Sequence, residues 1–194
     1  MLNKIFVSEV RVKILRIMLL NPGKDLHVRA IVRAVGSEIN AVRRELENLV
    51  SIELLRRRQS SNRIYYSVNT SHPFFSDLIS LVAKENELSL KLYKNIKNLG
   101  NVIYIMMSKS FLRGRKSSAL DVDLFIVGDI NNSILEKIIK EEESKIGREI
   151  NYSVMSDEEF MSRKRTLDQF IVRLMFQGRT MLNGDEEKFC SIIQ

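Results

Sequence analysis

Apolar residues near the start of the chain recur at the spacing of a helix in three short stretches. The predicted helices cover residues 8–20, 26–35 and 38 to about 50. Gly36 follows the second stretch, where a residue that stops a helix is expected. Ser37 comes next and is the predicted N-cap of the third helix. Two short helices joined by a tight glycine turn form the outline of a helix-turn-helix.

The third predicted helix has two chemically different faces. At roughly 100° per residue, its apolar residues fall in one narrow sector, made of Ile39, Val42, Leu46, Leu49 and Val50. The opposite side carries short hydrogen-bonding groups and arginine: Ser37, Asn40, Arg44 and Asn48, with Arg43 on the flank. Arginine pairs with guanine edges or phosphates, and asparagine pairs with adenine. This polar face therefore suits the major groove of DNA.

Two strands are predicted after these helices, over residues 54–58 and 63–68, with a polar turn between them. Side chains alternate between the two faces of a strand, so some arginines here point outward, toward phosphates or a minor groove. The candidates for such DNA contacts are Arg56, Arg58 and Arg63. For Arg57 alone, a solvated surface residue is the simpler interpretation. Three helices followed by this two-stranded wing predict a winged helix-turn-helix.

The distribution of charge agrees with that prediction. The net charge is +7, and residues 1–70 account for all of it, with 13 Lys+Arg against 6 Asp+Glu. Such segregation is typical of a nucleic-acid-binding module joined to something else, although a solvated basic face gives the same count. The stretch GSEINAVRRELENLVSIELLRRRQSSNRIYYSVN resembles the winged helix-turn-helix of prokaryotic transcriptional regulators, over about residues 5–70. The resemblance implies a homodimer on double-stranded DNA, although winged helices also serve as protein contacts.

One long helix is predicted over residues 73–99, with Pro73 in its first turn and Gly100 after its last apolar position. At 1.5 Å per residue it would be about 40 Å long. Its apolar stripe consists of Leu78, Val82, Leu88, Leu92, Ile96 and Leu99. The helix is either a connector packed on its own chain or a dimer helix that sets the spacing of DNA half-sites. The length of the stripe favours the dimer.

Beyond residue 101, strands and helices alternate, which indicates a small α/β domain. Strands are predicted over 102–107, 122–128 and 149–155, and a helix over 133–146. The S-x-x-E pattern that begins at Ser156 is a capping box and opens a further helix.

One stretch of this second part holds a pattern suited to phosphoryl transfer. Ser110 is followed by Arg113-Gly114 and, eleven residues after Ser110, by Asp121-Val122-Asp123. Two carboxylates in a D-x-D on a strand point to one face and can share Mg²⁺ ions that align the reacting groups. The stretch MMSKSFLRGRKSSALDVDLFIVG resembles the minimal nucleotidyltransferases of the DNA polymerase β-like superfamily. The resemblance covers about residues 100–185 and implies a nucleotide site at Lys109, Ser110, Asp121 and Asp123.

Two positions depart from that family's pattern. The resemblance puts a phosphate-cradling glycine at Lys109 and a third carboxylate near Asn151. A lysine side chain fills the space where phosphates approach, and asparagine is no general base. We therefore expect no catalytic residue and no required cofactor, with Mg²⁺ held only loosely by the two aspartates if it binds. The alternative is that these aspartates are relics that hold a turn, paired with Arg113 or Arg115.

Other features exclude whole classes of protein. No apolar run approaches the roughly 20 residues that a membrane span needs, and charges interrupt the first apolar positions too often for a signal peptide. The single cysteine, Cys190, cannot form an internal disulfide, and with two histidines there is no His/Cys cluster for zinc. We expect a cytoplasmic protein in which Cys190 is a buried thiol rather than a nucleophile.

These patterns predict an α+β chain in three parts: a winged helix-turn-helix at 1–70, a long linker or dimerisation helix at 71–100, and a small nucleotidyltransferase-like α/β domain at 101–194. The leading hypothesis is a sequence-specific transcriptional regulator whose second domain is a sensor or scaffold. The runner-up is an active Mg²⁺-dependent nucleotidyltransferase, and the third hypothesis is an antitoxin-like protein that neutralises a partner. The expected partners are double-stranded DNA, a second copy of the chain, and a nucleotide or protein at the C-terminal domain.

Overall fold

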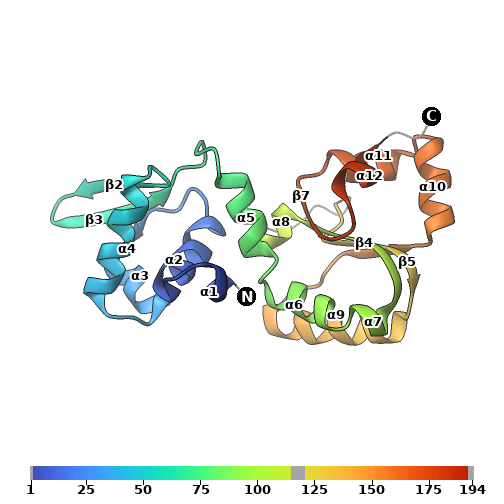
Figure 1. Cartoon of the computed structure of the whole chain (residues 1–194), viewed down its shortest axis with the longest axis horizontal. Coiled ribbons are helices and arrows are strands. Elements are labelled where there is room, and N and C mark those ends of the chain that lie inside the picture. Colours follow the sequence, from blue (N-terminus) through green and yellow to red (C-terminus); the bar gives the residue numbers. More distant parts are fainter. Residues whose placement is uncertain (1, 115–120, 192–194) are drawn as a thin grey trace. The chain divides into compact units, whose positions relative to one another are not determined.

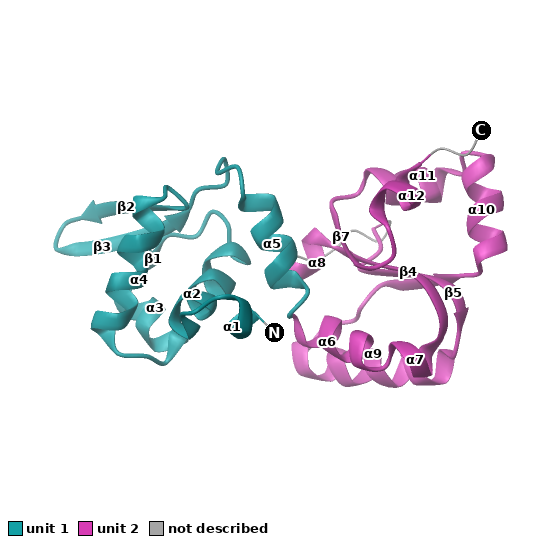
Figure 2. Cartoon of the chain, in the orientation of Figure 1, with its two compact units in different colours: residues 1–85 teal, residues 86–194 magenta. Residues whose placement is uncertain are grey.

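The chain divides into two compact units, residues 1–85 and residues 86–194 (Figure 2). The computed structural model describes residues 2–114 and 121–191. Each unit combines helices with a β-sheet (Figure 1), so the α+β class predicted from the sequence is confirmed. None of the helices in the described residues is long and apolar enough to cross a membrane.

Unit 1 contains the three helices and the hairpin that the sequence predicts, together with a short strand that it does not. Its elements are α1 (Leu2–Ile5), α2 (Glu9–Leu19), β1 (Leu26–His27), α3 (Val28–Val35), α4 (Ile39–Ser51), β2 (Leu55–Ser60), β3 (Arg63–Val68) and α5 (Phe75–Ala83). The three strands form an antiparallel sheet in the order β1-β3-β2. Strand β1 has only two residues, which is too short for any hydrophobic alternation to signal it.

The ends of these helices follow from local side chains. The Ser8 hydroxyl caps α2 by accepting a hydrogen bond from the Arg11 N–H at 3.2 Å. Gly36 ends α3 in the left-handed conformation, with φ 64°, which glycine adopts without steric cost. The prediction that Ser37 caps α4 is wrong. Because α4 begins at Ile39, the N-cap position belongs to Glu38, which makes no side-chain capping bond.

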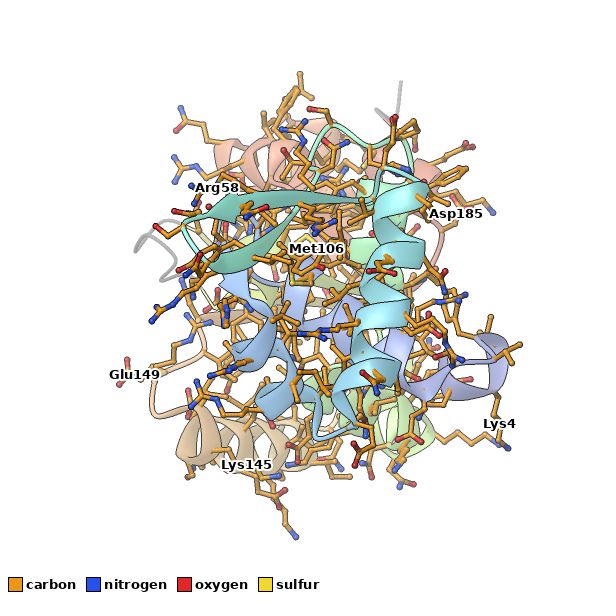
Figure 3. All side chains as sticks on the ribbon, turned by 90° about the vertical axis from the view of Figure 1, so that its left-hand side faces the viewer. Lys4, Arg58, Met106, Lys145, Glu149 and Asp185 are labelled. Atoms are coloured by element: carbon orange, nitrogen blue, oxygen red, sulfur yellow. The ribbon has the colours of Figure 1, made fainter. Side chains whose placement is uncertain are left out.

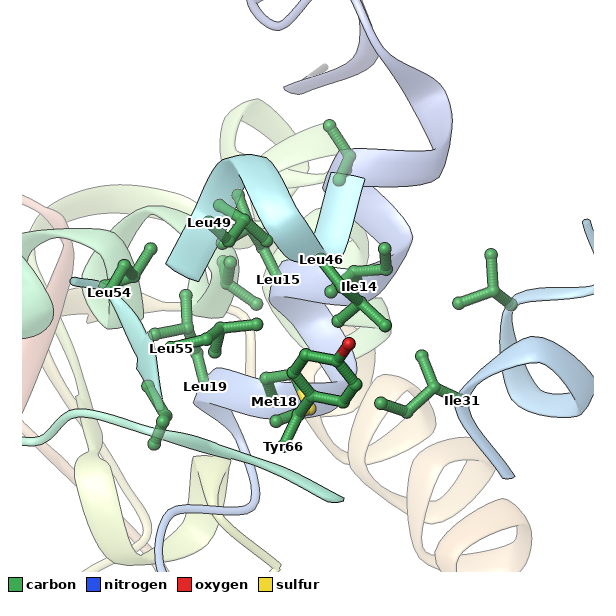
Figure 4. Close-up of a cluster of buried hydrophobic side chains, with 14 of the residues drawn as sticks. Ile14, Leu15, Met18, Leu19, Ile31, Leu46, Leu49, Leu54, Leu55 and Tyr66 are labelled. Atoms are coloured by element: carbon green, nitrogen blue, oxygen red, sulfur yellow. The ribbon is translucent and has the colours of Figure 1, made fainter. Parts of the chain in front are cut away.

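The core of unit 1 is formed where α2, α3 and α4 meet the inner face of the sheet (Figure 4). Its largest contributors are Ile14, Leu15, Met18, Leu19, Ile31, Leu46, Leu49, Leu54, Leu55 and Tyr66. The predicted apolar sector of α4 is confirmed, since Val42, Leu46 and Leu49 are buried while Ile39 and Val50 are half-buried. Burying that sector leaves the opposite side of α4 in solvent.

The prediction of one long helix over residues 73–99 is wrong. The segment forms α5 in unit 1 and then α6 (Glu87–Lys94) and α7 (Ile96–Leu99) in unit 2. The break follows from two side chains. The Glu85 carboxylate turns back into unit 1, to Arg16 and the Leu2 N–H, and Asn86 caps α6 by accepting from the Leu88 N–H at 2.9 Å.

The apolar stripe therefore belongs to two cores rather than to one surface. Val82 packs in the core of unit 1, whereas Leu88, Leu92 and Leu99 are buried where α6 and α7 pack against the helix α9 (Asn132–Ile146) of unit 2. The length of the stripe gives no reason to expect a dimer.

Unit 2 is a mixed four-stranded sheet covered by helices on both faces (Figure 1). Its other elements are β4 (Gly100–Ser108), α8 (Lys109–Leu112), β5 (Leu124–Ile130), β6 (Tyr152–Met155), α10 (Asp157–Arg165), α11 (Gln169–Phe176), β7 (Arg179–Asn183) and α12 (Glu186–Cys190). The sheet order is β6-β5-β4-β7, with β5 and β6 parallel and the other pairs antiparallel. The predicted capping box is confirmed in part, because the Ser156 side chain accepts from the Glu159 N–H.

An ion pair between half-buried Arg11 and buried Glu45 joins α2 to α4 in unit 1. Glu45 is only 3% exposed, and one of its carboxylate oxygens accepts a hydrogen bond from Arg11 Nε at 2.8 Å. Burial raises the pKa of Glu45, but hydrogen bonds from Arg11, Ser8 and Asn48 and the charge of Arg11 outweigh it, so the net pKa is lowered. A carboxylate whose pKa is lower in the folded state stabilises the fold above its ordinary pKa and loses that contribution as the pH falls.

Glu45→Gln keeps the size of this side chain and removes its charge. We expect the free energy of unfolding of unit 1 to fall by about 1–3 kcal/mol at neutral pH. The parent chain loses stability as the pH falls below the ordinary glutamate pKa of about 4.3. We expect this acid-induced loss to be smaller in Glu45→Gln. Hydrogen exchange of the α4 backbone amides across this pH range measures both effects. Glu47→Gln is the matched control, because Glu47 is exposed on the same helix. An unchanged acid dependence in Glu45→Gln would contradict the assignment.

Candidate functional site

The polar side of α4 is the first candidate surface. Asn40, Arg43, Arg44 and Asn48 are exposed along it, and Ser37 is half-buried at its beginning. Within the described part of the chain, neither Arg43 nor Arg44 forms an ion pair. The Asn48 side chain contributes a hydrogen bond to Glu45 and so has a partner inside unit 1. Figure 3 shows α4 beside the β2–β3 hairpin on one face of unit 1.

The hairpin is longer than predicted, with a turn of two residues, Ser61 and Asn62, in place of four. Two of its three predicted DNA-binding arginines have partners within unit 1. Arg58 forms an ion pair with Asp25 at 2.7 Å and lies over the Tyr65 ring, and Arg56 donates a hydrogen bond to Asn69 at 2.7 Å. All three remain exposed, and Arg63 stands directly after the turn.

Arg57 is the wing arginine that the sequence analysis interprets as a solvated surface residue and leaves out of the DNA contacts. On β2 it shares a face with the buried Leu55, and across the ladder it pairs with Tyr66, which is also buried. Burial raises the pKa of Tyr66, while the positive charges of Arg57 and Arg43 act in the opposite direction. Both arginines are therefore close to the same phenol, and Arg57 belongs to the α4 side of the hairpin. Counting the alternation from Leu55 would have identified it.

The second candidate surface lies in unit 2, at the ends of β4, β5 and β6. Ser108 is fully buried and caps α8 by accepting from the Phe111 N–H at 3.0 Å. Lys109 follows as the first residue of α8, and its N–H donates to the Gly178 carbonyl at 2.8 Å. A methyl group added at Gly178 would lie 3.8 Å from the Cβ and Cδ atoms of Lys109. The lysine side chain thus covers the backbone before β7, and Ser110 next to it is exposed.

The D-x-D pattern comes directly before β5 and not within it, which corrects the predicted strand of 122–128. Asp123 joins three strand ends through its backbone. Its carbonyl accepts from the Ser108 N–H at 2.9 Å, and its N–H donates to the Asn151 carbonyl at 2.7 Å. Its side chain is only 2% exposed, and Oδ2 accepts from the Asn151 N–H at 3.1 Å.

Asn151 occupies the position that a third carboxylate would need. The parallel register pairs Leu124 with Tyr152, so the preceding residues, Asp123 and Asn151, lie side by side. The Asn151 side-chain amide donates a hydrogen bond to the Asp121 carbonyl at 2.6 Å. Among the described residues, no group of three or more His, Cys, Asp or Glu side chains is placed to hold a metal ion.

This donor set does not fit the metal pair that the resemblance implies. Two-metal phosphoryl transfer requires carboxylates that are open to both ions. Here Asp123 is buried against a backbone N–H, and the third position carries an amide. Arg115, the predicted alternative partner of the aspartates, lies outside the described residues.

A hollow of about 470 Å³ opens beside the same strand ends. It is lined by Val122, Asn151, Ser153, Asp168, Gln169, Phe170 and Arg173. Asp168 also caps α11 by accepting from the Phe170 N–H at 3.0 Å. The lining of this hollow is mostly polar, with an aromatic ring, amides and both signs of charge. Phe170 is half-buried and also packs against the core of unit 2.

Cys190 and Lys164 are two further polar residues. Both lie on the opposite side of the sheet from α9. The Cys190 thiol is half-buried, rather than buried as predicted, and accepts a hydrogen bond from Arg179 at 2.6 Å. Lys164 is only 1% exposed, and its ammonium donates to the Lys188 carbonyl at 2.6 Å. Burial lowers the pKa of Lys164. Both side chains hold α12 against the rest of unit 2, which is a structural role.

A comparison with known protein families agrees with the geometry of unit 2. Residues 91–173 match a family model described as a nucleotidyltransferase domain. The matched stretch includes the D-x-D pattern and Asn151. The chain therefore carries a nucleotidyltransferase-like domain. No curated protein and no solved structure matches the chain.

The burial of Asp123 predicts a structural role that can be measured. Asp123→Ala removes a buried carboxylate that accepts the Asn151 N–H, so we expect the free energy of unfolding of unit 2 to fall by about 1–3 kcal/mol. Asp121→Ala is the matched change, and we expect a smaller loss because that side chain is half-buried. Hydrogen exchange in β5 and β6 measures both. Equal losses in the two variants would contradict a special role for Asp123.

Proposed function

We propose that this chain, which carries a nucleotidyltransferase-like domain in unit 2, is a sequence-specific DNA-binding transcriptional regulator. In this proposal unit 1 is a winged helix-turn-helix, α4 is its recognition helix and the β2–β3 hairpin is its wing. The observation that carries the proposal is the exposed side of α4, where Arg43 and Arg44 stand without carboxylate partners in the described residues. Arginines left in this way are free to pair with guanine edges or phosphates.

Three further features support DNA as the partner. The three-helix arrangement and the sheet order β1-β3-β2 put a hairpin next to α4, so helix and wing can contact one duplex together. Arg57 adds a positive charge on the α4 side of that hairpin. The excess charge of the whole chain belongs to residues 1–70, and such a field attracts the phosphate backbone.

We further propose that the domain in unit 2 transfers no nucleotidyl group and serves as a sensor or scaffold. Lys109 covers the backbone where the family's glycine would leave room for phosphates. Asn151 stands in place of a third carboxylate and holds the Asp121 carbonyl. Transfer depends on positioning and charge neutralisation by the complete set of ligands. The hollow beside Asn151 supports a sensor, because it offers a ligand pocket without a metal centre.

The active nucleotidyltransferase is the second candidate, and the family match favours it because both aspartates of the D-x-D are present in the matched stretch. The antitoxin-like partner is the third, and a stoichiometric protein that co-purifies with the chain would favour it. The homodimer also stays a prediction. It rests on the resemblance to dimeric regulators, because the stripe over 73–99 no longer supports it.

The recognition helix predicts a specific pattern of loss in DNA binding. We expect Arg44→Ala and Asn40→Ala each to weaken binding to the tightest-binding duplex by about 1–3 kcal/mol and to relax sequence preference. Binding to random duplexes should change much less. Fluorescence anisotropy with both kinds of duplex measures the difference. Arg165→Ala is the control, since Arg165 is exposed in unit 2. If a double variant of Asn40 and Arg44 bound its best duplex as tightly as the parent chain, α4 would not be the recognition helix.

The donor set of unit 2 predicts that labelled nucleoside triphosphates with Mg²⁺ give no transfer product. Lys109→Gly combined with Asn151→Asp restores the family's pattern, and we expect this variant to bind Mg²⁺ more tightly in calorimetric titration. Asp123→Asn should leave DNA binding unchanged where the fold is retained. Transfer by the parent chain that is lost in Asp123→Asn would overturn the proposal and establish the enzyme.

Sedimentation velocity with and without DNA tests the homodimer. We expect a dimer at micromolar concentration, because two copies present two recognition helices to a palindromic site. A monomer under both conditions would exclude it.

A further inference from the structure

Unit 1 carries a second basic feature, which shares only Arg63 with the proposed recognition surface. A hollow of about 480 Å³ is lined by His27, Arg29, Val32, Arg33 and Arg63. Arg29 and Arg33 are one turn apart on α3, and Arg63 begins β3. The hollow therefore lies between the outward side of α3 and the start of β3.

Two of the lining residues, His27 and Arg63, reach this hollow from strands, and the other three reach it from α3. On β3, residues alternate between the core face, which holds the buried Tyr66 and Val68, and the outer face, which holds Arg63 and Tyr65. His27 pairs with Tyr65 across the ladder, and the two rings contact each other at 5.6 Å between centroids. The hollow thus connects the outer face of β1 and β3 with the solvent side of α3, and none of its lining residues belongs to α4.

The charges at the hollow are not balanced within unit 1. The lining residues include three arginines and no acidic side chain. In the residues that the structure describes, Arg29, Arg33 and Arg63 form no ion pair, whereas the nearby Arg58 is paired with Asp25. Three like charges around one hollow repel each other, and an anion placed among them relieves that repulsion.

The geometry points to a phosphate-binding site at this hollow. Guanidinium groups form paired hydrogen bonds with phosphate oxygens, and several arginines around one concavity are the arrangement that phosphate recognition uses. His27 adds a donor, because its Nδ1 accepts the Arg29 N–H at 3.3 Å and a neutral imidazole then carries its proton on Nε2. The phosphate comes either from the DNA backbone or from a free phosphorylated molecule.

Titration calorimetry of the full chain with inorganic phosphate tests the site without any DNA. We expect saturable binding to the parent chain and a Kd at least about tenfold higher in Arg29→Ala/Arg33→Ala. Arg63→Ala should weaken binding as well. Lys4→Ala is the control, because it removes one positive charge from unit 1 outside both the hollow and the proposed recognition surface, and its Kd should be unchanged. Equal binding in all four chains, or no saturable binding to the parent, would overturn the site.

The salt dependence of binding to random duplexes then identifies the source of the phosphate. If a backbone phosphate occupies the hollow, the slope of log Kd against log salt falls by about one in Arg29→Ala/Arg33→Ala. If the slope is unchanged while inorganic phosphate binding is lost, the site takes a free phosphorylated molecule. A chain that binds phosphate through these arginines but binds no duplex would contradict the proposed DNA-binding function and leave the phosphate site intact.

Discussion

The burial of one side of α4 is the constraint on which unit 1 depends. Val42, Leu46 and Leu49 complete a core shared with α2, α3 and the sheet, and a helix that buries one face must expose the other. The same packing that stabilises the unit therefore presents Arg43 and Arg44 to solvent. The ion pair between buried Glu45 and Arg11 holds α4 against α2. The position of the exposed arginines on α4 therefore follows from the packing of the core.

In unit 2 the corresponding constraint is the hydrogen bonding around Asp123. Its backbone links Ser108 to Asn151, and its carboxylate accepts a further N–H. An aspartate placed in this way completes the strand ends, and its Oδ2 atom is already bonded to a backbone N–H. The backbone bonds that build these strand ends do not require a third carboxylate, so the nucleotidyltransferase-like domain does not by itself imply the activity.

Most of the helices and strands that position the two candidate surfaces could be predicted from periodicity, because each buries a clear apolar stripe. The faces of α4 are the best case. The breaks in the segment 73–99 could not be predicted from periodicity, because α5, α6 and α7, which are divided between two cores, leave the same apolar spacing as one long helix. A tertiary contact between the Glu85 carboxylate and Arg16 contributes to the break after α5. A local sequence pattern does not show such a contact. The pairing of Arg58 with Asp25 and the arginine hollow of α3 depend on strand register, and so also required the structure.

The central claim is that the exposed side of α4 reads DNA sequence, and selection from a pool of random duplexes tests it most directly. The full chain is incubated with the pool, and the retained fragments are sequenced over several rounds. The account predicts that one recurring sequence is enriched by the parent chain and that the enrichment is lost when Asn40 and Arg44 are both replaced by alanine. Retention of no fragments, or of fragments that share no sequence, would contradict it.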